Sequence, residues 1–108
     1  MIARIWRGVT PNSKSDEYLT YVMETGVKDC RATEGNRGVY VLRRTSGGQA
    51  EFLFISLWES FDAIRKFAGL DIEKAVYYPK DKDFLLGPEP NVTHYEVMVG
   101  PQKDSQSL

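Results

Sequence analysis

The sequence predicts an α+β fold in which two helices cover one face of a four-stranded antiparallel sheet. The first indication is residues 51–58, which alternate as a strand with apolar side chains on both faces. At Ser60 the apolar period then changes from about two residues to about 3.6, which predicts a helix. The second indication is the Gly-rich connection at 46–49, which joins this strand to an apolar strand over 37–45 and predicts a hairpin.

The strand at 51–58 is expected to lie in the centre of the sheet, because both of its faces are apolar. One face carries Phe52, Phe54, Ser56 and Trp58, and the other carries Leu53, Ile55 and Leu57. Ser60 is a suitable N-cap for the helix that follows, and Gly69 is a suitable stop. We therefore expect a strand that leads directly into an amphipathic helix.

The N-terminal third predicts a strand over 2–7, with Ile2, Arg4 and Trp6 on one face. Residues 8–12 have the composition of a turn. A first helix is expected at about 14–25, ended by Gly26, and a loop is expected over 27–36.

After the second helix, Asp71 is expected to begin one or two further helical turns, which Pro79 ends. Residues 80–83 are expected to form a solvated loop, and 91–99 the last strand. The resulting β-α-β-β-α-β order is the ferredoxin-like arrangement. Two helices cover only one face of such a sheet, so the other apolar face predicts a homodimer that packs sheet to sheet.

Length and composition restrict the class of protein. The 108 residues suit one domain over 1–99, followed by a polar tail over 100–108 that we expect to be disordered. A net charge of −1 does not suggest a nucleic-acid partner, and the apolar runs are too short to span a membrane. The charged N-terminus is unlike a signal peptide, and Cys30 has no second cysteine to pair with, so we expect a cytoplasmic protein.

Three segments resemble the antibiotic biosynthesis monooxygenase-like proteins of the dimeric α+β barrel superfamily. They are residues 58–60 (Trp-Glu-Ser) at a strand-to-helix junction, 75–79 (Ala-Val-Tyr-Tyr-Pro) and 94–97 (His-Tyr-Glu-Val). The resemblance covers most of residues 1–99. It implies a homodimer with a cavity for a small hydrophobic ligand between sheet and helices, and oxygen chemistry on aromatic molecules without metal, flavin or heme.

The same resemblance does not favour heme degradation. The heme-degrading branch uses an Asn on the first strand, a Trp on the second helix and a His ten residues later. The two later positions fall on Phe67 and Tyr77 here, and residues 2–7 contain no Asn.

Two residues are candidates for catalysis. His94 is the single histidine, so it is the natural general base near neutral pH, although a structural histidine within the sheet explains it as well. Tyr77 is the candidate proton donor to a quinone oxygen, and helix capping or packing is the alternative.

Four further residues are candidates for substrate binding. Trp58 and Trp6 can stack on an aromatic ligand, but Trp58, as the last residue of a buried strand, is more simply a core anchor. Phe67 is a candidate by the family position given above. Arg4 binds an anionic group if it points into a cavity, whereas it is an ordinary edge charge if it faces solvent.

The sequence therefore leaves two main hypotheses. The first is a cofactor-independent monooxygenase that acts on a small aromatic or quinol-like substrate, with His94 as base. The alternative is a non-catalytic, small-molecule-binding or stress-related homodimer. A His94 that lines the cavity beside a tyrosine favours the enzyme, and one that points away favours the binding protein. No set of Cys and His residues has metal-ligand spacing, so no metal is expected. The family resemblance implies that no other cofactor is needed.

Overall fold

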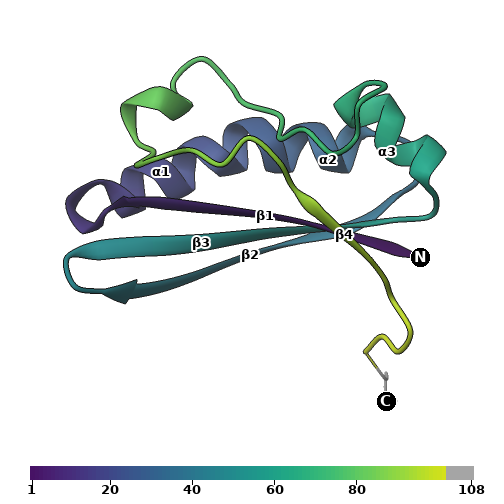
Figure 1. Ribbon diagram of the computed structural model, residues 1–108, viewed down its shortest axis with the longest axis horizontal. Coiled ribbons are helices and arrows are strands. Elements are labelled where there is room, and N and C mark those ends of the chain that lie inside the picture. Colours follow the sequence, from purple (N-terminus) through teal and green to yellow (C-terminus); the bar gives the residue numbers. More distant parts are fainter. Residues whose placement is uncertain (102–108) are drawn as a thin grey trace.

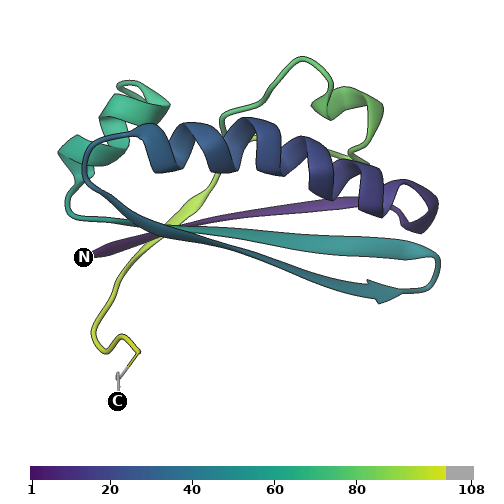
Figure 2. The same ribbon diagram turned by 180° about the vertical axis from the view of Figure 1, so that it is seen from behind.

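The computed structural model describes residues 1–101, and it has the predicted order of strands and helices (Figure 1). One antiparallel sheet has the strand order β2-β3-β1-β4. Its strands are β1 (Ile2–Pro11), β2 (Asn36–Ser46), β3 (Gln49–Trp58) and β4 (Thr93–Glu96). The helices lie on one face of this sheet, and the segment between α3 (Phe61–Ala68) and β4 returns along the same side (Figures 1 and 2).

The two central strands are well matched to the pattern in the sequence. β3 lies between β2 and β1, and the hairpin turn between β2 and β3 uses Gly47 and Gly48 at positive φ. β1 is longer than predicted, because residues 8–11 continue the ladder with β3 instead of turning. The turn-like composition of this stretch was misleading, since Gly8 pairs with Phe52 and leaves space for the neighbouring Trp6 ring.

The first helix is also longer than predicted. It continues from α1 (Ser15–Val22) through a π-helical turn, η2 (Met23–Val27), into α2 (Lys28–Ala32), as Figure 2 shows. A short 3-10 turn, η1 (Asn12–Lys14), precedes it. The prediction that Gly26 ends the helix was therefore wrong. Gly26 is buried, and a Cβ atom there would lie 3.1 Å from the ring of Phe54, so this glycine permits close packing on the sheet.

The second helix begins as predicted and is followed by an irregular segment. The Ser60 hydroxyl accepts a hydrogen bond from the backbone N–H of Ala63 at 3.1 Å, and Gly69 follows the last turn of α3 with φ 86°. The helical turns expected after Asp71 are absent. Ala75 instead donates its backbone N–H to the carbonyl of Pro90, so this stretch pairs with the chain that leads into β4. The solvated loop expected at 80–83 contains a 3-10 turn, η3 (Asp81–Asp83), and β4 is shorter than the predicted strand over 91–99.

The core lies between the sheet and the helices, in two clusters. The first is aromatic and aliphatic and sits under α1: Tyr18, Val22, Val27, Ala50, Phe52 and Leu85. The second sits under α3: Cys30, Trp58, Ala63 and Ile64. The space between the two clusters is where the candidate site lies.

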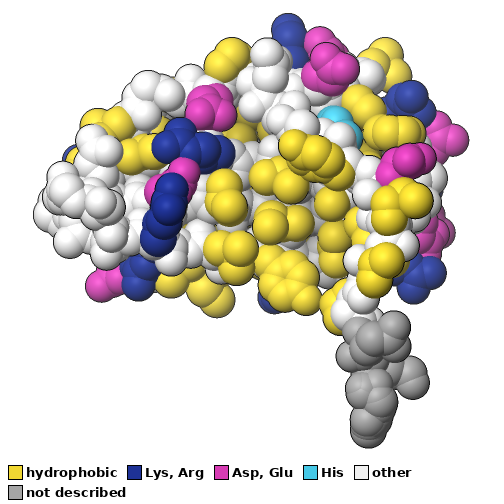
Figure 3. All heavy atoms as spheres, turned by 60° about the horizontal axis from the view of Figure 1, so that its bottom comes forward, with side chains coloured by type: hydrophobic (Ala, Val, Ile, Leu, Met, Phe, Trp, Pro, Cys, Tyr) yellow, Lys and Arg dark blue, Asp and Glu magenta, His cyan; other side chains and the backbone are white. Residues whose placement is uncertain are grey.

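The opposite face of the sheet carries no helix. Its centre is apolar (Figure 3), and the strand register brings together Ala3, Ile5, Tyr40, Leu42, Leu53, Ile55, Leu57 and Tyr95. We call these eight residues the open face. Tyr40, Leu42 and Tyr95 are about half exposed in the single chain.

Within residues 1–101, no helix has the length and apolar character that crossing a membrane requires. Most of the predicted tail, residues 102–108, lies outside the described residues. The single domain over 1–99 stays a prediction.

Candidate functional site

A cavity lies between the covered face of the sheet, the helix around Gly26 and the segment 76–81. It has about 510 Å³ of atom-free space, including the part that is open to solvent. Its walls are mainly aromatic and aliphatic, with a few polar groups; they comprise Arg4, Trp6, Tyr18, Val22, Thr25, Gly26, Phe54, Ser56, Phe67, Val76, Tyr77, Tyr78, Asp81 and Val92. Apolar walls with a few convergent polar groups are typical of small-molecule sites.

Arg4 is the buried cation of this cavity, with 4% of its surface exposed. Its Nη1 donates to the carbonyl of Ile72, and its Nη2 donates to the carbonyl of Lys74 at 2.9 Å. The guanidinium carbon also lies 6.0 Å from the centre of the Phe67 ring. Within residues 1–101 no carboxylate pairs with Arg4. Burial lowers the pKa of Arg4, because desolvation disfavours the charged form.

His94 does not line the cavity but lies behind Arg4. Its Nε2 is 3.1 Å from Nη1 of Arg4. A guanidinium has only donors, so Nε2 accepts this hydrogen bond and the neutral ring carries its proton on Nδ1. Burial and, second, the charge of Arg4 lower the pKa of His94. His94 thus orients Arg4, and its engaged nitrogen is not directed at a ligand.

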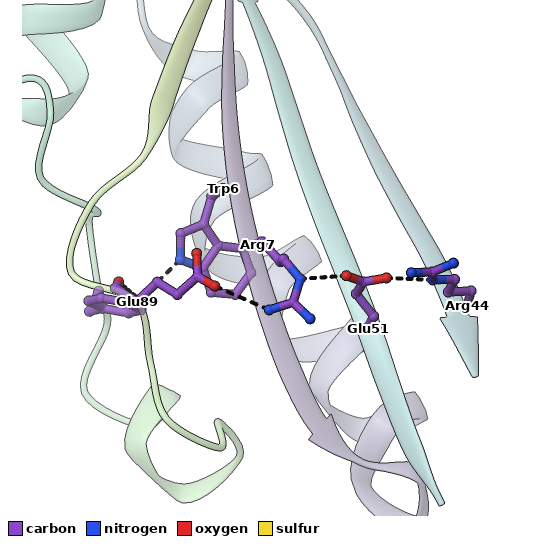
Figure 4. Close-up of polar contacts among 6 residues, drawn as sticks. Trp6, Arg7, Arg44, Glu51 and Glu89 are labelled. Atoms are coloured by element: carbon purple, nitrogen blue, oxygen red, sulfur yellow. Dashed lines mark hydrogen bonds and ion pairs between the residues drawn. The ribbon is translucent and has the colours of Figure 1, made fainter. Parts of the chain in front are cut away.

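Trp6 and Tyr77 form one wall of the cavity together. Trp6 Nε1 donates to the Tyr77 hydroxyl at 3.1 Å, and that hydroxyl donates to the carbonyl of Glu89 (Figure 4). The Trp6 ring lies along its own strand over Gly8, where a Cβ atom would come within 2.1 Å of the ring. Burial is the main reason that the pKa of Tyr77 is raised, so its hydroxyl keeps its proton at neutral pH.

Phe67 lines the cavity, whereas Trp58 lies behind it. Trp58 is fully buried, its ring stacks on Phe67 with centroids 5.8 Å apart, and its Nε1 donates to Ser56 at 2.8 Å. Trp58 therefore supports the cavity wall through Phe67. The structure brings Arg4, Trp6, Phe67 and Tyr77 together around one space, and it places His94 and Trp58 one layer further out.

Sequence reasoning missed Asp81, a second charged residue on the wall of the cavity. Asp81 was assigned to a solvated loop, yet it is 7% exposed. It accepts hydrogen bonds from the Tyr18 hydroxyl at 3.2 Å and from the backbone N–H of Tyr78 at 2.6 Å. Burial raises the pKa of Asp81. The only available signal was Pro79, since an Asp soon after a proline is common in turns whose side chain bonds back to the chain.

Residues 1–101 form neither a cluster of metal ligands nor a reactive thiolate. This part of the chain holds no group of three or more residues that suits a metal ion. Cys30 is buried, and burial raises the pKa of its thiol to about 12, so it is not a thiolate at neutral pH.

No family model and no curated protein matches this sequence. Solved structures do. The structure is similar to that of MhuD from Mycobacterium tuberculosis, a heme degrader solved with two hemes in its active site. That comparison has a TM-score of 0.61 and 18% identity, and it covers 94% of this chain and 100% of MhuD. It is also similar to Rv0793 from the same organism, with a TM-score of 0.53, 19% identity, and coverage of 96% of this chain and 97% of that one.

Sequence identities this low show a shared fold and leave the chemistry to be argued from the site. Both similarities extend over nearly the whole of each chain, and they agree with the strand order and the one-sided helix layer. The predicted fold class is confirmed. The chain has the fold that its resemblance to the antibiotic biosynthesis monooxygenase-like proteins implied.

Proposed function

We propose that the protein binds a small aromatic molecule that carries an acidic oxygen, such as a carboxylate, phenolate or enolate. The observation that carries this proposal is Arg4, a buried guanidinium on the cavity wall that has no carboxylate partner within residues 1–101. A buried charge without a counterion is costly, and an anionic ligand oxygen would offset that cost. The aromatic walls supply the rest of the contact.

The experiment compares 2-naphthoate with its neutral amide by calorimetry, in the wild type and in Arg4→Met. We expect the wild type to prefer the acid about 10- to 100-fold, which is the range for a hydrogen bond to a charged group. The preference should disappear in Arg4→Met. It should persist in part in Arg4→Lys, which keeps the positive charge but loses the planar guanidinium that can donate two parallel hydrogen bonds.

Arg37→Met is the matched control, because Arg37 pairs with Glu59 on the surface, away from the cavity. Equal affinity of the wild type for acid and amide would overturn the proposal. Hemin belongs in the same titration, since MhuD holds heme in this fold. Tight hemin binding that survives Arg4→Met would point to a different ligand class.

We also infer that the protein is a homodimer formed through the open face. The support is the contiguous apolar surface in the centre of the sheet (Figure 3), which is larger than isolated surface hydrophobics would give. A second copy presents an identical face, so one symmetric contact would cover both.

A cofactor-independent monooxygenase is the second candidate function. The fold is that of antibiotic biosynthesis monooxygenase-like proteins, and the buried Arg4 is suited to stabilise a ligand oxyanion. The Tyr77 hydroxyl already donates its proton to the Glu89 carbonyl. In an anthrone, a methylene carbon would lose a proton, react with O₂ and become a carbonyl, while the second oxygen leaves as water. The position of His94 outside the cavity instead favours the binding protein.

Oxygen uptake separates the two functions. Metal-free protein is mixed with anthrones and hydroquinones, and the rate is compared with that of Arg4→Met. Uptake that depends on Arg4 establishes the oxygenase. If the ligands bind through Arg4 without uptake across the panel, the binding function stands alone.

A further inference from the structure

The cavity wall carries a second buried charge. Asp81, like Arg4, is largely buried, and no lysine or arginine pairs with it within residues 1–101. The neighbouring Lys80 and Lys82 side chains are exposed. One cavity thus has a cation and an anion on its wall, and each lacks a counterion.

The Asp81 carboxylate has hydrogen-bonding capacity to spare. Each of its oxygens receives one hydrogen bond, from the Tyr18 hydroxyl and from the Tyr78 backbone N–H. An ionised carboxylate has about four acceptor positions, so roughly two are open. Open acceptor positions on a buried carboxylate attract a donor, because an unsatisfied buried polar group is costly.

Asp81 also borders a second hollow. This hollow is lined by residues of the segment 74–90, and Tyr77, Tyr78 and Asp81 line both hollows. Asp81 therefore lies where the two hollows adjoin.

We propose that Asp81 accepts a hydrogen bond from a hydroxyl group of the same ligand whose acidic oxygen binds Arg4. This inference rests on the proposed function and narrows its ligand class to hydroxylated aromatic acids and polyphenols. An anion at one end satisfies Arg4, and an O–H donor at the other satisfies Asp81. In an oxygenase, Asp81 then takes the proton of that hydroxyl, and the bonding electron pair stays on the ligand oxygen as a phenolate.

The test uses naphthoates with a hydroxyl at different ring positions, each beside its methoxy analogue. The methoxy group keeps the oxygen and removes the donor. We expect at least one hydroxyl isomer to bind the wild type about tenfold or more tightly than its methoxy partner. Asp81→Asn should abolish that preference, so that the hydroxyl and methoxy isomers bind this variant with the same affinity.

Two further variants separate recognition from structural support. Tyr18→Phe removes a donor to Asp81 and keeps the carboxylate, so it should retain the hydroxyl preference; a purely structural Asp81 predicts that Tyr18→Phe and Asp81→Asn behave alike. Asp83→Asn changes an exposed carboxylate in the same turn and should have no effect.

The outcomes distinguish this inference from the proposed function. If naphthoates bind through Arg4 but no isomer shows a hydroxyl preference, or if the preference survives Asp81→Asn, the role of Asp81 is overturned and the proposed function stands. If no naphthoate prefers the wild type over Arg4→Met, the proposed function fails and this inference fails with it.

Discussion

Within residues 1–101, charged side chains are paired with opposite charges on one face of the sheet and are buried without a counterion on the other. On the uncovered side, Glu51 pairs with both Arg7 and Arg44, and Arg7 also contacts Glu89 at 3.1 Å (Figure 4). On the covered side, Arg4 and Asp81 are buried and are not paired with each other. Arg4 and Arg7 both come from β1 and lie three residues apart. Because side chains alternate along a strand, Arg4 faces the covered side of the sheet and Arg7 faces the uncovered side.

This difference supports the proposed role of the buried charges in ligand recognition. The charges of the exposed cluster (Arg7, Arg44, Glu51 and Glu89) pair with one another at the surface. Such solvent-exposed ion pairs contribute little to stability. The buried groups are held by carbonyls, hydroxyls and a neutral histidine, which fix their positions without cancelling their charge. A binding site needs such positioned and uncancelled groups.

The largest effect is expected from a charge placed on the open face. Ile55→Glu should convert a dimer to a monomer, because a buried unpaired carboxylate costs on the order of 3–5 kcal/mol and weakens association more than 100-fold. Sedimentation velocity across a concentration series measures this. Met23→Glu on the exposed helix surface is the control. A wild type that stays monomeric at high micromolar concentration would contradict the dimer.

A substitution that narrows the cavity on the covered face should have the next largest effect. Gly8→Ala places a Cβ atom where the Trp6 ring lies and forces the ring into the cavity. We expect about tenfold weaker naphthoate binding, as for the loss of roughly 1.4 kcal/mol, and a changed Trp fluorescence spectrum. In the Trp6→Phe background the same change should cost little, since the clashing ring atoms are gone; equal costs in both backgrounds would exclude this contact as the cause.

A smaller effect is expected from the His94 contact with Arg4. Burial and the Arg4 charge lower the pKa of His94 below its ordinary 6.5, so the folded state binds the proton less readily than the unfolded state. The stabilisation is therefore complete above about pH 6.5 and is lost as pH falls from 6.5 through the lowered folded pKa. Chemical denaturation between pH 7.5 and 5 measures this slope. His94→Gln should flatten it, and an unchanged slope would assign it to other groups.

The smallest effect is expected from the exposed cluster. Arg44→Ala removes one of the two arginines on Glu51 and leaves Arg7 in place. Exposed ion pairs are screened by solvent, so the unfolding midpoint should hardly change, and raising the salt concentration should remove what difference there is. A drop as large as that of a core substitution would mean that this cluster is more than a surface feature.

Most of the fold could be predicted because it depends on local patterns. The period-two run at 51–58, the glycine hairpin and the Ser60 cap each define their element without long-range information. The errors arose where tertiary contacts overrode local preference. The helix continues through Gly26 because this glycine packs on Phe54. Residues 72–76 are not helical, because the backbone N–H of Ala75 pairs with the carbonyl of Pro90.

The candidate site could be predicted only in part. Alternation placed Arg4 and Trp6 on one face of β1, and the helix pattern placed Phe67 toward that face. The roles of His94 and Asp81 depend on which residues from distant segments they meet. His94 reaches Arg4 across the pairing of β4 with β1, and Asp81 reaches Tyr18 across 63 residues of sequence.

The sequence by itself determined the element order, the two-sided apolar centre of the sheet and the set of residue types available for chemistry. The tertiary structure decided which charges are paired and which are not. The physical reason is that burial and pairing are properties of the space between segments. The charge run at 80–83 appears solvated along the chain, but only folding places Asp81 against Tyr18 on the wall that Arg4 also lines.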